Sequence, residues 1–147
     1  MIPPFDPVTG RLPPGEHEAL WDEVVERFGW NERRRRLIDG LADALMSLAE
    51  VGCRRVWLNG SFVTTKDEPG DFDACWDQTD VDLDSIDPVL LDLSDARRSQ
   101  KDRFGGELFP NVTELGTGLM FADFFQNDRE IGRKGIVVID LTTGGWT

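Results

Sequence analysis

Two aspartates separated by one apolar residue constrain this chain more than any other feature. Asp71 and Asp73 flank Phe72 in a segment that predicts a β-strand over 71–76. On a strand alternate side chains share a face, so both carboxylates are expected on one side and Phe72 on the other. Two like charges held this close repel each other unless a cation lies between them. The pair therefore indicates a binding site for a divalent metal ion.

The residues before this pair suit phosphate. Residues 54–59, with the apolar Val56-Trp57-Leu58 at their centre, predict a short buried strand, and Gly60 and Ser61 follow where that strand ends. A glycine leaves neighbouring backbone N–H groups accessible that a larger side chain would block, and such groups bind phosphate oxygens. Gly60 and Ser61 are therefore candidate phosphate-binding residues beside the candidate metal site.

The negative charge of the chain is concentrated in one segment. The net charge is −12, and residues 67–95 contain eleven acidic side chains and no Lys or Arg. Such a surface repels the nucleic-acid backbone and attracts metal ions or a basic protein partner. A solvated face without a partner is the alternative for the acids beyond Asp73. A nucleic-acid partner is disfavoured.

The composition predicts a folded, single-domain protein over 1–147, with 39% hydrophobic residues. No apolar run reaches the roughly 18–20 residues that span a bilayer, and the first residues lack the regions of a signal peptide. We therefore expect a cytoplasmic location and no membrane partner. Cys53 and Cys75 are expected to be small buried apolar side chains, and His17, the single histidine, is expected at the surface.

Hydrophobic periodicity and the positions of glycine and proline predict the order of the helices and strands. A proline-rich stretch over 1–15 predicts an extended arm, and residues 119–125 suit either a helix or a strand. Gly105-Gly106 and Pro110 are expected to interrupt regular structure. Helices are predicted over 16–28, over 32–51 with Asn31 as N-cap, from Asp87-Pro88, and over 97–104; strands are predicted over 54–59, 71–76 and 135–141.

Taken together, these residues resemble the polymerase-beta-type nucleotidyltransferases, and in size the minimal nucleotidyltransferases. Leu58-Asn59-Gly60-Ser61, Asp71-Phe72-Asp73 and Val138-Ile139-Asp140-Leu141 carry the resemblance. The segments 12–17 and 60–66 are also similar to a group of bacterial and phage proteins placed in that superfamily. The resemblance implies an α/β (α+β) fold in which helices flank a mixed sheet, here with an extended proline-rich N-terminal arm.

The resemblance also implies an activity. Such a protein transfers a nucleoside monophosphate from a nucleoside triphosphate, with ATP expected, to a hydroxyl of a protein, RNA or small molecule, in some cases within a toxin–antitoxin or phage-defence system. Asp71, Asp73 and Asp140 would bind Mg²⁺ or Mn²⁺ and serve catalysis, while Gly60 and Ser61 hold the phosphates. Family members usually place an Arg and a Gly shortly after Gly-Ser. Here Lys66 is the candidate for that positive charge.

The sequence is compatible with more than one role for the acidic segment and for the two groups of basic residues. The altered loop and the clustered acids are also typical of a catalytically inactive binding module that holds a protein partner through its acidic face. The basic residues over 33–36 suit either solvent exposure with pairing to the acidic segment, which is preferred, or contact of one or two of them with a phosphate or a nucleic acid. The basic residues over 97–103 could fold back toward a bound triphosphate.

Overall fold

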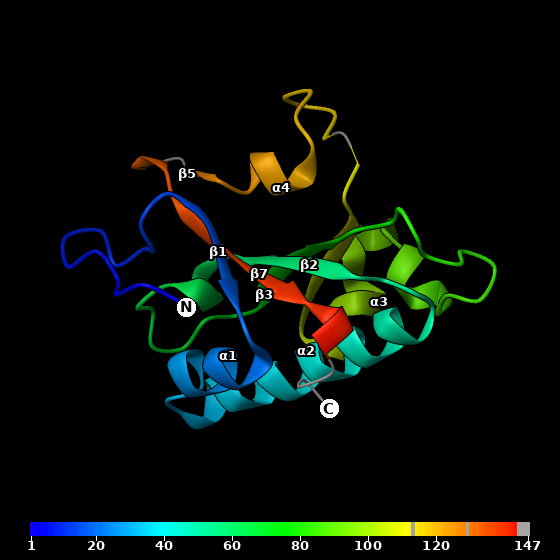
Figure 1. The fold of residues 1–147 in the computed structure, drawn as a ribbon, viewed down its shortest axis with the longest axis horizontal. Coiled ribbons are helices and arrows are strands. Elements are labelled where there is room, and N and C mark those ends of the chain that lie inside the picture. The colour runs from blue at the N-terminus through cyan, green and yellow to red at the C-terminus, as the bar shows by residue number, and fades with distance from the viewer. Residues whose placement is uncertain (113, 129, 144–147) are drawn as a thin grey trace.

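The fold is built on a five-stranded mixed β-sheet (Figure 1). The computed structural model describes residues 1–112, 114–128 and 130–143. Strand order is β1-β7-β2-β3-β4; β1 pairs parallel with β7, β3 pairs parallel with β4, and the two central pairings are antiparallel. The mixed sheet flanked by helices confirms the expected α+β class. The strands are β1 (Gly15–Ala19), β2 (Arg55–Asn59), β3 (Phe72–Trp76), β4 (Gly106–Pro110) and β7 (Gly135–Asp140).

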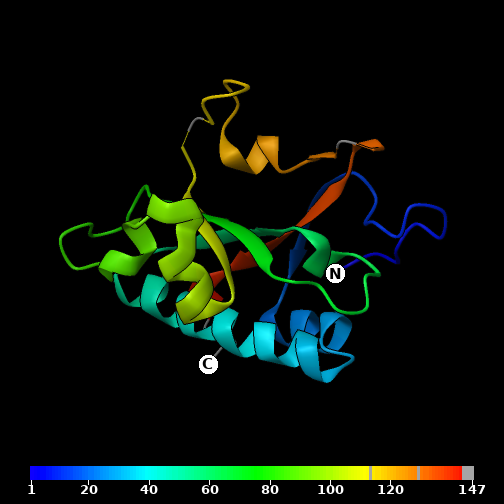
Figure 2. The same ribbon diagram turned by 180° about the vertical axis from the view of Figure 1, so that it is seen from behind.

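Three helices cover one face of this sheet: α1 (Trp21–Phe28), α2 (Glu32–Glu50) and α3 (Ser94–Phe104) (Figures 1 and 2). Asn31 caps α2 as predicted, because its side chain accepts a hydrogen bond from the Arg34 amide at 2.9 Å. The apolar stripe of α2 is buried against the inward side chains of the strands. The main core includes Leu37, Leu41, Leu45, Leu48, Val56, Leu58, Phe72, Ala74, Val137 and Ile139.

The opposite face of the sheet is covered by the short helix α4 (Phe121–Phe124) and the hairpin of β5 (Asn127–Asp128) and β6 (Gly132–Arg133) (Figure 1). A second apolar cluster lies beneath α4, where Ala122 and Phe125 pack on outward side chains of the strands. These are Trp57, Cys75, Ile136 and Val138. Each central strand therefore carries apolar side chains on both faces over much of its length, as sheets covered on both sides do.

The close approach of α2 and α3 requires a glycine in α2. A Cβ atom on Gly40 would lie 1.8 Å from the carbonyl oxygen of Phe104. Gly40→Ala is therefore expected to lower the free energy of unfolding by about 2 kcal/mol, although alanine favours helices, because overpacking must displace backbone. Urea unfolding followed by circular dichroism measures this. The neighbouring exposed Asp39→Ala is the control; equal stability of the two variants would contradict the prediction.

Several predicted elements differ from the observed ones. The predicted helix over 16–28 is wrong in its first part, because Glu16 to Ala19 belong to β1 and the helix begins at Trp21. The predicted helix from Asp87 is only one 3₁₀ turn, η2 (Pro88–Leu91). The segment 119–125 contains a helix, α4. β4 was not expected, because Gly106 and Pro110, its first and last residues, suggested an interruption.

Three smaller expectations concern single residues and the membrane. Cys53 and Cys75 are both buried free thiols, as predicted. His17 lies half-buried on β1 with Nε2 2.6 Å from the Pro13 carbonyl oxygen, so the expected surface position is only partly met. Among the residues described, none of the helices has the length and apolar character that crossing a membrane requires.

Candidate active site

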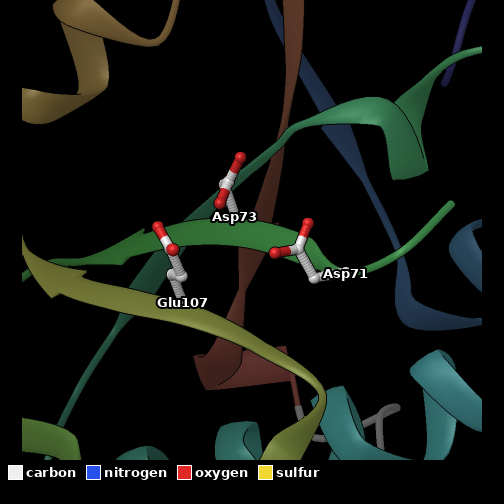
Figure 3. A group of neighbouring side chains, drawn as sticks. All are labelled: Asp71, Asp73 and Glu107. Atoms are coloured by element: carbon white, nitrogen blue, oxygen red, sulfur yellow. The ribbon is translucent and has the colours of Figure 1, made fainter. Parts of the chain in front are cut away.

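Strand alternation places the two aspartates as the sequence predicts. Phe72, Ala74 and Trp76 point into the main core from β3. Asp73 and Cys75 therefore point to the other face, and Asp71, which directly precedes the strand, lies on that side as well (Figure 3). Both carboxylates are partly buried. The apolar partners of β3 thus hold the acidic pair in place.

A third carboxylate joins them from β4. The parallel register sets Asp73 opposite Glu107, so both side chains leave the sheet on the same face. One carboxylate oxygen from each of Asp71, Asp73 and Glu107 lies within 4.8 Å of the others (Figure 3). We refer to these three residues as the carboxylate cluster. Three converging oxygen donors form a ligand set that suits a hard divalent cation.

Asp140, the predicted third carboxylate, does not join this cluster. It ends β7, where the antiparallel register places it opposite Arg55 at the start of β2. The cluster lies at the other end of β2, where Asn59 pairs with Asp73. Asp140 instead accepts hydrogen bonds from the Thr142 amide and hydroxyl, which hold the pKa of its carboxyl below the usual range. The carboxylate that lies with Asp71 and Asp73 is that of Glu107, whereas the resemblance implies Asp140.

Gly60 and Ser61 lie beside the cluster. Gly60 has a φ of 87°, in the left-handed region, and directly follows Asn59 at the end of β2. A Cβ atom on Gly60 would be 2.9 Å from Asp73 Oδ2 and 3.2 Å from the Asp73 amide nitrogen. Ser61 begins the short 3₁₀ turn η1 (Ser61–Val63). The absence of a side chain at Gly60 thus brings this turn against the Asp73 carboxylate.

The cluster is electrostatically strained. Burial raises the pKa of Asp73 to about 7, and the charges of Asp71 and Glu107 add to that effect. The pKa of Asp71 is raised as well, again by burial first and then by Glu107. Such coupling means that these carboxylates resist ionising together when no cation balances them. The like charges of Asp71 and Asp73 therefore repel each other in the folded protein, as the spacing of the two aspartates predicts.

Basic side chains of α3 neutralise Glu107. Lys101 Nζ and Arg97 Nη2 lie 3.0 and 3.2 Å from the same Glu107 oxygen. Arg97 follows Asp95 and Ala96, and all three non-glycine residues have positive φ, between 49° and 60°. This conformation is unfavourable for L-residues with side chains, so tertiary contacts must maintain it. The basic segment over 97–103 thus contacts the cluster itself.

A cavity of about 390 Å³ opens beside Gly60 and Ser61. Lys66 and Lys134 line it together with Arg11. Arg11 is paired with Asp128 at 3.2 Å, whereas neither lysine ammonium has a hydrogen-bond or ion-pair partner among the residues that the structure describes. Burial lowers the pKa of Lys134, which is partly buried. We call this space the phosphate-side cavity; Lys134 and Arg11 were not anticipated from the sequence.

The start of α2 holds the loop that carries these groups. The Arg34 guanidinium donates to the carbonyl oxygens of Phe62, Thr64 and Lys66 at 2.5–3.1 Å, and to that of Phe28 at 3.2 Å. The Arg33 side chain donates to the carbonyls of residues 69 and 70. The preferred expectation of solvent exposure is therefore wrong for Arg34, which is fully buried. Arg33 and Arg34 thus anchor the loop between Ser61 and Asp71.

The residues present fit a divalent cation. The three carboxylates of the cluster each offer one oxygen within 4.8 Å of the others. Gly60 adds a space next to Asp73 that any Cβ atom would fill. The carboxylate cluster would hold the ion, and Ser61 with the two lysines would face an anion bound next to it. This arrangement can gather a metal ion and phosphate groups at one place.

Comparison with known proteins places the chain in a family without assigning an activity. No curated protein and no solved structure shows significant similarity to it. The profile of one family, described as a family of unknown function (DUF6932), matches residues 3–140. That match spans β1 to the end of β7 and therefore includes the carboxylate cluster and the Gly60-Ser61 turn. The chain belongs to the DUF6932 family.

Proposed function

We propose that this protein is a metal-dependent nucleotidyltransferase, which moves a nucleoside monophosphate from a nucleoside triphosphate to a hydroxyl acceptor. One observation carries the proposal: three carboxylates on two adjacent strands meet beside a Gly-Ser turn and a cavity lined by lysines. Four residues at this place, Gly60, Ser61, Asp71 and Asp73, also carry the resemblance to the nucleotidyltransferase pattern in sequence. ATP with Mg²⁺ or Mn²⁺ is the first combination to test, and the acceptor is a protein, RNA or small molecule.

The carboxylate cluster would bind the cation. Asp71, Asp73 and Glu107 supply oxygen ligands from a face of the sheet that the main core holds rigid. A bound divalent ion would neutralise phosphate charge and favour loss of the acceptor hydroxyl proton. Such an ion could compensate the negative charge of Glu107, which ion pairs with Arg97 and Lys101 compensate in this structure.

The phosphate-side cavity would hold the β- and γ-phosphates. Its lysines carry positive charge that no acid within the described residues pairs with directly, and the Ser61 hydroxyl is likewise without a hydrogen-bond partner there. A charged donor in a partly buried position, such as Lys134, binds phosphate more strongly than it would in open solvent, and the exposed Lys66 adds positive charge beside it. Lys66 and Lys134 together could therefore replace the Arg that minimal nucleotidyltransferases usually carry after Gly-Ser. Positioning and charge neutralisation would supply most of the rate enhancement.

Labelled nucleoside triphosphates incubated with Mg²⁺ or Mn²⁺ and cell extract test the proposal. Wild type is expected to give a labelled product, and Asp73→Asn and Glu107→Gln are each expected to reduce labelling by about a hundred-fold or more, because the cation site is lost. Asp140→Asn is the matched control. It removes a carboxylate on the same sheet, but outside the cluster, and should keep most of the activity.

Three results would count against parts of this proposal. No labelled product with any nucleotide, metal or extract fraction argues against transfer. Equal loss in Asp140→Asn and Glu107→Gln, with all variants folded by circular dichroism, would refute the choice of Glu107 over Asp140. Undiminished labelling in Asp73→Asn would refute the cluster as the catalytic site.

A second candidate function is a non-catalytic binding module with a protein partner. The acidic segment 77–95 exposes three leucines among its aspartates, Leu83, Leu91 and Leu93. Exposed apolar side chains within a charged rim are typical of interaction surfaces. A basic partner with an apolar patch would fit. Capture of one specific protein that is unaffected by Asp73→Asn, together with no labelling, would favour this alternative over the enzyme.

A further inference from the structure

A second cavity, of about 380 Å³, borders the carboxylate cluster on the side of β4 and α4. Asp73 and Glu107 of the cluster line it. Phe109 of β4 and Phe121 and Phe124 of α4 line it as well. We call this space the phenylalanine cavity. Its volume lies in the range of small-molecule binding sites.

The three phenylalanines present ring faces at different angles. Phe109 and Phe121 are stacked, with centroids 4.7 Å apart and an interplanar angle of 14°. Phe124 meets Phe121 edge to face at 6.2 Å and 85°. All three rings are only partly buried, whereas Phe125 beneath them is buried. The lower cluster therefore supports rings whose remaining surface faces the cavity, and such surfaces bind flat rings by stacking.

Two buried polar groups at the same cavity lack partners. Asn59 is 6% exposed, and its Oδ1 atom has no hydrogen bond to any residue that the structure describes. Arg97 Nε is likewise buried and unpaired within the described residues, while its guanidinium lies 5.4 Å from the Phe109 ring centre. Unsatisfied buried groups are costly. A ligand with polar atoms on the edge of a flat ring would satisfy such groups, whereas a purely apolar ligand would not.

The two cavities meet at the end of β2, where Asn59 lines the phenylalanine cavity and the next residue, Gly60, lines the phosphate-side cavity. The phenylalanine cavity extends from Asn59 past Asp73 of β3 to Glu107 and Phe109 of β4. Asp73 lies between them, with its carboxylate close to Gly60 and also lining the phenylalanine cavity. A molecule with phosphates at one end and a flat ring at the other can therefore span the cluster.

We propose that the phenylalanine cavity binds the base of the nucleoside triphosphate whose phosphates occupy the phosphate-side cavity. This inference rests on the proposed function and adds to it the place where the nucleoside is recognised. Stacking on Phe121 and Phe124 supplies affinity for the ring, and the unpaired groups of Asn59 and Arg97 supply contacts that can discriminate among bases.

Calorimetric titration with matched ligands tests the base site without an acceptor. The probes are the four nucleoside triphosphates and ribose 5′-triphosphate, which has the same sugar and phosphates without a base, each with Mg²⁺. At least one nucleoside triphosphate is expected to bind wild type about ten-fold more tightly than ribose 5′-triphosphate does. Phe121→Leu/Phe124→Leu keeps apolar bulk, removes the ring faces and should abolish that advantage while changing ribose 5′-triphosphate binding less than about two-fold.

The control variant is Phe5→Leu, which removes an aromatic ring packed on Phe28, outside both cavities, and should behave as wild type does. Equal binding of the base-bearing and base-free ligands to wild type would overturn the base site and leave the proposed function standing. Equal weakening of both ligands in the double variant would show that the rings serve the fold, which also overturns the inference. Binding of none of the ligands would refute the proposed function and the base site together.

Discussion

Arg34→Met is expected to lower the free energy of unfolding by about 3–5 kcal/mol. The wild-type guanidinium is fully buried, lies 3.6 Å over the Trp30 ring and donates to four backbone carbonyl oxygens. Methionine fills a similar space but leaves those carbonyls without donors, and each buried unsatisfied group costs about 1–3 kcal/mol. Burial lowers the pKa of Arg34 to about 10, so the wild-type side chain stays charged at neutral pH.

Chemical unfolding of Arg34→Met, with Arg36→Met as the matched control, measures this effect. Arg36 is exposed on the same helix, and its substitution should change stability by less than about 0.5 kcal/mol. Arg34→Lys should lie between the two, because one ammonium cannot reproduce the planar set of donors. Stability of Arg34→Met equal to that of Arg36→Met would show that the loop over 61–70 holds its shape without this anchor.

Asp73→Asn is expected to stabilise the metal-free protein by about 2–4 kcal/mol at pH 8 and to have little effect near pH 4. In the folded state the pKa of Asp73 is raised from 3.8 to about 7, so the folded protein binds this proton more tightly than the unfolded chain does. Stability contributed in this way is present below the unfolded pKa and is lost as pH rises from about 4 to about 7. Asparagine has no such charge to bury.

Thermal and urea unfolding between pH 4 and pH 8, in the presence of a chelator, measure how the stability difference between Asp73→Asn and wild type grows with pH. Asp140→Asn is the control with the opposite sign: hydrogen bonds from Thr142 lower its folded pKa, so its contribution is present above the unfolded pKa and is lost in acid. Adding Mg²⁺ or Mn²⁺ at pH 8 should stabilise wild type and stabilise Asp73→Asn less, because ligands stabilise the state they bind. A stability difference between Asp73→Asn and wild type that does not vary with pH would contradict the buried charge as its cause.

Local rules account for the parts of the site that lie within one segment. Asp71 and Asp73 share a face because alternation along a strand depends only on sequence spacing. Gly60 adopts a positive φ at the end of β2, where a glycine was expected to matter. The leucine stripe of α2 lies in the core because its periodicity matches a helix. In each case the neighbours along the chain carry the necessary information.

The third carboxylate required information from outside its own segment. Glu107 lies between Gly106 and Pro110, residues that discourage a strand when they are considered alone. Parallel pairing with β3 overrides that preference, because Phe72 and Trp76 provide a paired and buried neighbour. The alternation of Glu107, Leu108 and Phe109 is the signal that could have revealed it. The resemblance to the nucleotidyltransferases implies Asp140 instead, because their pattern places a third carboxylate on a later strand.

The sequence by itself determined the acidic pair and the glycine turn before it, because these follow from strand alternation and backbone freedom, and its resemblance to the nucleotidyltransferases implied the class of the fold. Only the tertiary structure decided that Glu107 rather than Asp140 completes the cluster, that Arg34 anchors the loop, and that Lys134 reaches the phosphate-side cavity. These outcomes depend on strand order and register, which join residues distant in the chain. Pairing of this kind is set by the whole core, so no single segment encodes it.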